Sequence, residues 1–261
     1  TFCDNLPEAE AKQCALLMHT ELRSEAGTDL IAVKEAFCPN NNVHFSQAKL
    51  TPDAMNILYN ISSVTINLSS SEGFGLSCAE SIMAGTPVIV TVTGGLQDQI
   101  GQVDDDGNPV KFDIDFASNN IGRYKKHGMW AYPIWPVTRV VQGSIPTPYI
   151  FDDLARWEDA ADAMMYWYLA GADKRTKCGA EGRRWALNEG GINAKNMCDQ
   201  FSQCVDYVLE NFVPVKQFGL YNPDTDYVGN HLPNDKHFGF PIPEIDKERL
   251  LKELEEKTEK V

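Results

Sequence analysis

The sequence has few basic residues and no long apolar run. Its 23 lysines and arginines stand against 37 aspartates and glutamates, which gives a net charge of -14. This charge repels a phosphate backbone or an anionic membrane surface at long range, so we expect no nucleic-acid partner. No apolar segment approaches the roughly 20 residues of a membrane span, and the first residues lack the pattern of a signal peptide. We therefore expect a cytoplasmic protein without a membrane span.

Motifs for metal, redox and nicotinamide chemistry are also missing. The seven cysteines include no C-x-x-C pair, so we expect them to be reduced and mostly buried. Asp104-x-Asp106-x-Asn108 resembles a calcium loop, but Pro109 replaces the required glycine, which favours a surface turn. The absence of Gly-x-Gly-x-x-Gly after an early strand excludes a nicotinamide-binding Rossmann enzyme. We predict neither a metal nor a cofactor.

Helical segments alternate with short apolar runs in the first half of the 261 residues. This alternation is typical of an α/β domain with a Rossmann-like, doubly wound parallel sheet. We expect strands at Ala15–His19, Val43–Phe45 and Val64–Leu68, with the first of them buried. We expect helices at Glu8–Lys12, Asp29–Phe37, Asp159–Ala170 and Ala194–Phe212, and one beginning at Thr51-Pro52 with Met55, Ile57, Leu58 and Ile61 on its apolar face.

Two regions depart from this pattern. Between Gly101 and Asp153 glycine, proline, aromatic and β-branched residues accumulate, which predicts a loop and hairpin insertion at about 101–153. Its aromatic stretch, Gly128–Pro136, either packs over the sheet edge or contacts a ligand. Residues 1–213 would form the main domain. Residues 214–261 would form an extension rich in glycine and proline that ends in a charged helix at Asp246–Lys260.

The segment Val64–Val90 has the order strand, glycine-bearing loop, helix, tight turn and strand. Gly85 stands where a helix needs a left-handed terminator, and Thr86-Pro87 ends the helix before an apolar run. In a parallel sheet the loop lies at the carboxyl edge of the strands, where open α/β folds bind ligands. We therefore expect a binding site in this loop.

Glycines leave the backbone of the loop uncovered. Gly73 and Gly75 carry no side chain that would shield the amides of Phe74, Gly75 and Leu76 at the helix start. Amides at the start of a helix attract anions, and a diphosphate fits that description. We predict that Gly73, Phe74, Gly75 and Leu76 form an anion site.

Two carboxylates flank the loop, and neither suits phosphate because like charges repel. Helical spacing places Glu80 on a face with Leu76, Ala79 and Met83, so its carboxylate would be partly desolvated and would need hydrogen-bond donors such as a ribose diol. Glu72 would accept hydrogen bonds from a sugar. In the alternative interpretation Glu72 caps the helix or exposed backbone amides, and Glu80 pairs with a lysine or arginine.

Three motifs follow one another here. They are Glu72-Gly-Phe-Gly-Leu-x-x-x-Glu80, Gly85-Thr-Pro-Val88 and Gly94-Gly-Leu-x-Asp98. The composite resembles the donor-site signature of retaining glycosyltransferases in the glycosyl transferases group one family, whose members have the two-domain GT-B fold. The likeness is tight over about Leu58–Ile100. It implies that the chain is the C-terminal, donor-binding half of that fold.

The resemblance also implies roles for individual residues. Glu80 would bind the nucleotide ribose, and Glu72 would be the catalytic-site residue that contacts hydroxyls of the donor sugar. Gly94 and Gly95 would line the same crevice, whereas Asp98 would be either structural or a ligand. Residues 46–50 would lie near the nucleobase.

Other parts of the family pattern are missing. The family usually neutralises the departing diphosphate with an arginine and a lysine after the first strand of this domain, and residues 1–14 contain only Lys12. We expect that basic pair, and an N-terminal acceptor domain, to lie upstream. Without them the chain would bind donor weakly and transfer little, because stabilisation of the leaving group is a large electrostatic contribution.

The leading hypothesis is a metal-independent hexosyltransferase. It would move a hexose from a nucleoside diphosphate sugar to an acceptor with retention, and this chain would be the donor-binding part. The alternative is a non-catalytic module that keeps the sugar-nucleotide pocket for binding or assembly.

Overall fold

The computed structural model describes residues 1–23, 27–110, 117, 119, 122–144 and 147–213. The chain divides into two units, Thr1–Val208 and Leu209–Val261. In the second unit the described residues are 209–213, so the helix predicted at Asp246–Lys260 lies outside the described residues. The first unit contains the elements that form the candidate site.

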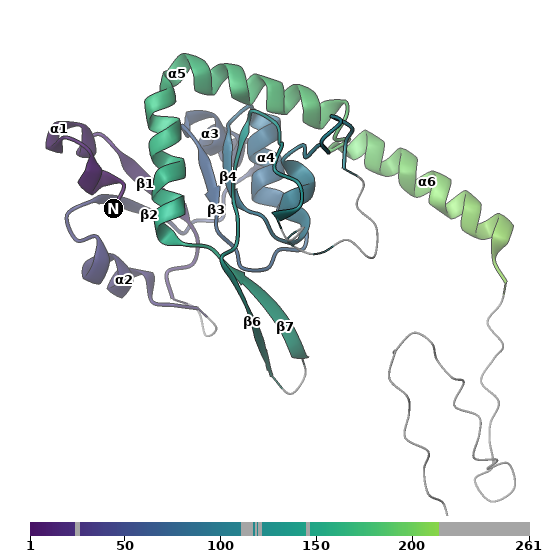
Figure 1. Ribbon diagram of the computed structural model, residues 1–261, viewed down its shortest axis with the longest axis horizontal. Coiled ribbons are helices and arrows are strands. Elements are labelled where there is room, and N and C mark those ends of the chain that lie inside the picture. The colour runs from purple at the N-terminus through teal and green to yellow at the C-terminus, as the bar shows by residue number, and fades with distance from the viewer. Residues whose placement is uncertain (24–26, 111–116, 118, 120–121, 145–146, 214–261) are drawn as a thin grey trace, which may run out of the picture. The chain divides into compact units, whose positions relative to one another are not determined.

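Helices and strands alternate through much of the first unit, as the sequence predicts (Figure 1). The helical elements are η1 (Cys3–Asn5), α1 (Glu8–Ala11), α2 (Leu30–Phe37), α3 (Pro52–Ile61), α4 (Leu76–Ala84), η2 (Gly94–Gln99), α5 (Trp157–Leu187) and α6 (Ala194–Asn211). The strands are β1 (Ala15–His19), β2 (Asn42–Ser46), β3 (Thr65–Asn67), β4 (Val88–Thr91), β5 (Ala131–Ile134), β6 (Thr138–Ser144) and β7 (Thr147–Leu154).

The strands of the α/β region pair in parallel. β1 pairs with β2, and β3, β4 and β5 form a second sheet in that order. β6 and β7 form an antiparallel hairpin, which confirms the hairpin predicted between Gly101 and Asp153. Parallel strands joined through helices make this a Rossmann-like α/β fold.

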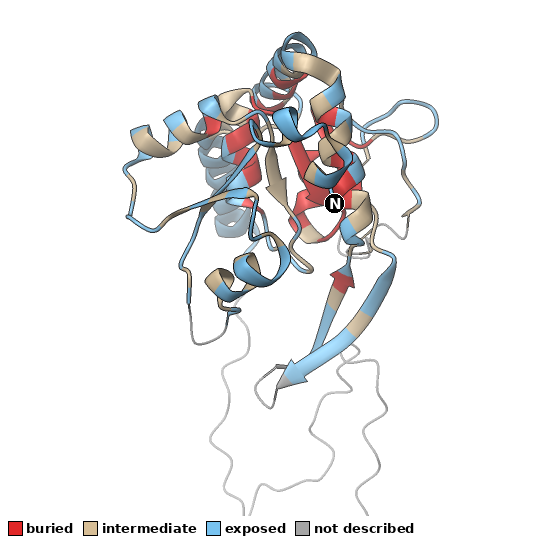
Figure 2. Ribbon diagram, turned by 90° about the vertical axis from the view of Figure 1, so that its left-hand side faces the viewer, coloured by how far each residue is buried: buried red, intermediate tan, exposed pale blue. Residues whose placement is uncertain are grey.

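The core lies on both faces of β4, whose four residues are all buried. Val88 and Val90 belong to a cluster with Cys78, Ile82 and other residues, whereas Ile89 packs with Ala163, Trp167 and their neighbours on α5. Alternate residues of a strand point to opposite faces, so helices cover this sheet on both sides. Figure 2 shows the buried residues gathered around these strands.

One long helix reaches both clusters because it bends. Gly171 interrupts α5 with a φ of 76°. The first half of α5 contributes Ala160, Ala163 and Trp167 to one cluster. The second half contributes Cys178 to that cluster and Ala186 to the other. α5 therefore holds the two faces of the sheet together.

The turn after α4 lies directly against α5. Gly85 has a φ of 85°, which confirms the predicted left-handed terminator. A Cβ atom on Gly179 of α5 would lie 1.7 Å from the carbonyl oxygen of Gly85. The two backbones therefore touch, and this contact requires a glycine at position 179, whereas the positive φ of Gly85 favours glycine at position 85.

The structure corrects several predictions about burial. β1 is largely exposed, with Leu16 at 45% and Leu17 at 41% exposure, so the prediction of a buried first strand is wrong. Ile57 and Ile61 of α3 are exposed, and Tyr59 is the buried residue of that helix. The cysteines are free as predicted, but they are not mostly buried: only Cys78 and Cys178 are, and Cys198 and Cys204 are exposed.

The aromatic stretch Gly128–Pro136 is not an insertion packed over the sheet edge. Residues Ala131–Ile134 form β5 and pair in parallel with β4, so this stretch is itself the edge strand among the described residues. The sequence obscured this strand because Pro133 interrupts its β-forming pattern.

The apolar residues of α6 are exposed to solvent. None of its residues is buried, and Met197 and Phe201 are 65% and 71% exposed. Among the described residues, no helix has the length and apolar character that crossing a membrane requires.

Candidate functional site

The predicted binding loop follows β3 and ends where α4 begins. It is packed directly against the backbone of η2. A Cβ atom on Gly94 would lie 1.9 Å from the carbonyl oxygen of Glu72, and one on Gly95 would lie 2.3 Å from that of Gly73. The amide of Gly95 donates a 3.0 Å hydrogen bond to the carbonyl of Glu72. The structure therefore brings the two predicted glycine segments together.

Gln99 fixes the second half of the loop from beneath. Its side-chain amide donates to the carbonyl of Phe74 and, at 3.2 Å, to the carbonyl of Gly75. The indole of Trp130 donates to the main-chain carbonyl of Gln99 at 3.1 Å. This buried glutamine orders the loop without occupying its outer surface, and the sequence analysis did not identify it.

The start of α4 has no side-chain cap. Its N-cap residue, Gly75, is in the left-handed conformation with a φ of 89° and forms no side-chain hydrogen bond. The amides of Cys78 and Ala79 donate to the carbonyl of Gly75, which leaves the amides before them facing outward. Leu76 is 69% exposed, so the start of this helix is open to solvent. Such an end attracts anions.

Glu80 lies one turn into α4 and is paired with Tyr59 of α3. The Tyr59 hydroxyl donates a 2.9 Å hydrogen bond to a carboxylate oxygen of Glu80. Tyr59 is 9% exposed, and burial followed by the hydrogen bond to Glu80 raises the pKa of its hydroxyl. Glu80 itself is exposed. Its exposure contradicts the expectation of a partly desolvated carboxylate, and no lysine or arginine among the described residues pairs with Glu80.

Glu72 lies at the other end of the loop and is half-buried. Its Cγ atom lies 3.5 Å from the position of a Cβ atom on Gly75, so its side chain runs along the loop. The described residues include no hydrogen-bond donor to its carboxylate. The helix-capping alternative for Glu72 receives no support, because α4 has no side-chain cap.

A buried ion pair anchors the hairpin to the beginning of the loop. The side chain of Asp153 is 1% exposed and accepts from the guanidinium of Arg139 at 2.8 Å, from Thr93 at 2.9 Å and from Asn119 at 2.8 Å. The amide of Asp153 donates to the carbonyl of Ser70 at 2.8 Å. The hairpin and the loop therefore share a rigid base.

The protonation of Asp153 reflects this pairing. Burial opposes ionisation, but the hydrogen bonds from Arg139 and Thr93 outweigh it and lower the pKa of the carboxyl below its ordinary value of 3.8. Sequence reasoning missed this cluster because its members lie far apart in the chain, although a charged residue in a β-rich segment is a usable signal.

Asp98 differs from the other acidic residues of the site. It lies in η2 and is exposed, yet surrounding protein atoms desolvate its carboxyl and raise its pKa to about 6. No described residue donates a hydrogen bond to it.

At the carboxyl ends of β1 and β2, His19 Nδ1 lies 3.0 Å from the hydroxyl of Ser46, where the predicted nucleobase loop begins. Among the described residues, no cluster of three histidine, cysteine or acidic side chains could hold a metal ion.

Residues 28–115 match the model of the family described as glycosyl transferases group 1. The match includes Glu72, Glu80, Gly94 and Gly95. It confirms the resemblance predicted from the three motifs. No curated protein matches the chain.

Proposed function

We propose that this chain, which contains a glycosyl transferases group 1 domain, is the donor-binding part of a retaining hexosyltransferase that uses a nucleoside diphosphate sugar. One arrangement carries the proposal. The exposed carboxylate of Glu80 is oriented by Tyr59 beside an uncapped helix start, so an acceptor for hydroxyls lies near a site for an anion. A nucleoside diphosphate carries both groups, a ribose diol and a diphosphate.

Each residue has a separate task in this proposal. The open amides at the start of α4 bind the diphosphate, and Gly73, where a Cβ atom would meet nothing within 4 Å, lets it approach the backbone. Gly75 is buried, and a Cβ atom there would lie 2.5 Å from Leu96, so this glycine serves the packing of the loop against η2. Glu80 accepts hydrogen bonds from the ribose. Glu72 accepts hydrogen bonds from the hexose hydroxyls and holds the anomeric carbon in place for the transfer. Gly94 and Gly95 pack against the backbone of Glu72 and Gly73 and so hold the loop in position.

The proposal includes a division of labour between two domains. In the GT-B architecture a second domain holds the acceptor, and a basic pair neutralises the leaving diphosphate in place of a metal ion. We propose the same arrangement here, with both supplied from outside the described residues. Because leaving-group stabilisation is worth several kcal/mol, we expect this chain to bind nucleotide and to transfer sugar poorly.

Calorimetric titration with UDP, GDP and ADP tests the proposal. We expect the chain to bind one of the three selectively. We expect Glu80→Gln to weaken that binding at least tenfold, because the neutral amide is a poorer acceptor for the ribose hydroxyls. Glu35→Gln on the exposed surface of α2 is the matched control and should bind like the parent chain.

Two results would contradict the proposal. Binding that Glu80→Gln leaves unchanged would place the nucleotide elsewhere. Absence of binding by any nucleotide, in a chain with cooperative unfolding and joined to its acceptor domain, would exclude the donor site. Selective binding without transfer by the joined protein would favour the non-catalytic module.

A further inference from the structure

A groove of about 390 Å³ lies along β5, and no residue of the binding loop lines it. β5 is the edge strand of its sheet among the described residues, and α5 lies beside it. Ligand sites of small molecules have volumes of roughly 300 to 1,000 Å³, so the groove is large enough for one. It is lined by His127, Met129, Ala131, Tyr132, Pro133, Trp135 and Tyr166.

Aromatic side chains form the wall of the groove. The rings of Tyr132 and Tyr166 are 5.2 Å apart and tilted by 52°, and Tyr166 is 39% exposed. Trp135 contributes a third ring where β5 ends, and Met129 is 50% exposed at the other end. Flat, partly exposed rings of this kind bind ligands that have apolar C–H faces.

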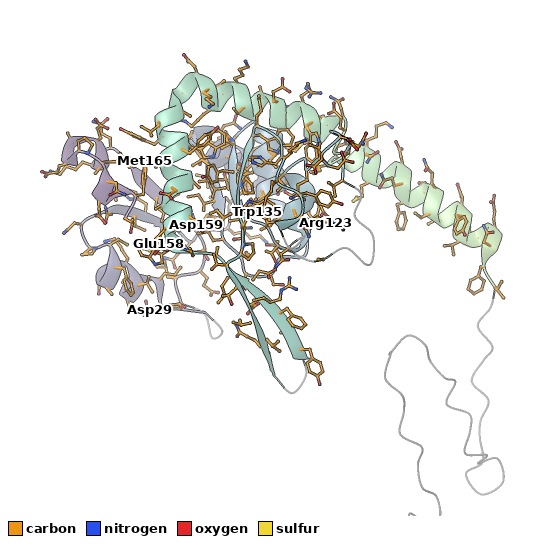
Figure 3. All side chains as sticks on the ribbon, in the orientation of Figure 1. Asp29, Arg123, Trp135, Glu158, Asp159 and Met165 are labelled. Atoms are coloured by element: carbon orange, nitrogen blue, oxygen red, sulfur yellow. The ribbon has the colours of Figure 1, made fainter. Side chains whose placement is uncertain are left out.

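Charges of both signs surround these rings. The ammonium group of Lys125 lies 3.7 Å from the ring centre of Trp135, and that of Lys174 lies 5.0 Å from the ring centre of Tyr166. On the α5 side, Asp162 and Asp159 act on Tyr132: burial and then these carboxylates raise the pKa of its hydroxyl. Figure 3 labels Trp135 and, in the first turns of α5, Asp159.

The mixture of charges restricts the chemistry of a ligand. An anion would be attracted by the two lysines and repelled by the two aspartates, and a cation would meet the reverse. A peptide strand could not extend the sheet here without losing a hydrogen bond, because Pro133 has no amide proton. A ligand with many hydroxyls and apolar ring faces suits every part of the lining.

We propose that this groove binds a neutral oligosaccharide, and that the oligosaccharide is the distal part of an acceptor chain whose reacting end is held by the second domain. The role as acceptor rests on the proposed function, whereas the binding of a sugar chain does not. The groove ends at the same edge of the sheet as the donor loop, since the amide of Val92 pairs with the carbonyl of Ile134 just before Trp135. A chain bound along β5 would therefore lead toward the donor site.

Titration of the whole chain with neutral hexasaccharides tests the proposal. The probes are the linear hexamers of glucose in α-1,4 and β-1,4 linkage, of mannose and of xylose, with a hexagalacturonate as the anionic comparison. We expect one or more neutral hexamers to bind more tightly than the anionic one. Tyr166→Ala should weaken that binding at least tenfold, and His127→Ala at the exposed rim should weaken it severalfold.

Tyr149→Ala is the matched control, because Tyr149 is an 82% exposed tyrosine on the hairpin outside the groove. It should bind within twofold of the parent chain. Three results would each overturn the proposal. They are no binding of any neutral hexamer, tighter binding of the anionic hexamer, and affinities of Tyr166→Ala and His127→Ala for the neutral hexamer that equal the affinity of the parent chain. Glu80→Gln separates the two sites: it should weaken nucleotide binding at least tenfold and leave hexamer binding unchanged, so the two proposals can be overturned independently.

Discussion

The hydroxyl of Tyr59 lies 2.9 Å from the carboxylate of Glu80 and joins α3 to α4 at the centre of the candidate site. Burial and this hydrogen bond raise the pKa of Tyr59, so the hydroxyl stays protonated and remains a donor at neutral and mildly alkaline pH. Glu80 therefore has one lone pair occupied by the protein and others open to solvent. Its orientation is set before any ligand arrives.

Tyr59→Phe removes this donor and keeps the buried ring. We expect a loss of about 1 kcal/mol of unfolding free energy, the usual worth of one hydrogen bond, together with severalfold weaker nucleotide binding because Glu80 becomes free to rotate. Urea unfolding and calorimetric titration measure the two effects. Tyr149→Phe on the exposed hairpin should change neither, and unchanged nucleotide affinity in Tyr59→Phe would show that Tyr59 does not position Glu80.

The contact between the loop and η2 predicts opposite results for two glycines. A Cβ atom on Gly95 would lie 2.3 Å from the carbonyl oxygen of Gly73, whereas one on Gly73 meets nothing within 4 Å. We expect Gly95→Ala to cost about 1 to 3 kcal/mol through overpacking and to lose nucleotide binding. Gly73→Ala, on the loop side of this contact, should unfold like the parent chain. Equal stability of the two variants in urea would contradict the close contact.

The buried pair of Arg139 and Asp153 predicts a pH dependence of stability. The pKa of Asp153 is lowered in the folded protein, so the stability from its charge is present above the ordinary value of 3.8 and is lost as pH falls through the lower folded value. Asp153→Asn should therefore be about 2 kcal/mol less stable at pH 7, less than for a fully buried pair because Arg139 is 34% exposed.

Urea unfolding at pH 7 and at pH 3 measures this difference. The gap between Asp153→Asn and the parent chain should narrow at the lower pH. Asp152→Asn is the matched control. The carboxylate of Asp152 accepts a hydrogen bond from Gln142 in an exposed pair, so its loss should have little effect on stability. A gap of constant size at both pH values would mean that the charge of Asp153 does not contribute.

Asp98 should show the opposite pH dependence. Its pKa is raised to about 6, so the folded protein favours the protonated carboxyl, and this contribution to stability is present below the ordinary value of 3.8 and lost as pH rises through 6. We expect Asp98→Asn to raise the melting temperature at pH 7.5 and to leave it nearly unchanged at pH 4. Thermal unfolding monitored by circular dichroism at both pH values tests this. A lower melting temperature at pH 7.5 would indicate that the charged carboxylate is needed.

Local signals predicted much of the fold. Thr51 accepts a hydrogen bond from the amide of Ala54 and caps α3, Asp29 caps α2, and Gly85 ends α4, as their residue types indicate. These features depend on a few neighbouring residues, so the chain itself specifies them. The prediction that β1 is buried was wrong. The exposure of a strand depends on which helices and strands cover it, and an apolar run in the sequence does not specify those neighbours.

The candidate site was predictable in its backbone and less so in its side-chain pairs. The order of glycines placed the loop at the start of α4, as the structure has it. The partner of Glu80 is 21 residues away, and that of Asp153 lies across a hairpin. Such pairs arise from tertiary packing, and no periodicity in one sequence identifies them.

The contact between Gly85 and Gly179 limits how this protein can change. A side chain at position 179 would meet the carbonyl oxygen of Gly85, and a side chain at position 85 would strain a backbone with positive φ. A side chain at position 179 therefore has no room, and no change at position 85 can make room for it, because the obstacle is the backbone carbonyl itself. In a library of random variants we expect these two sites to be among the least tolerant of the described chain.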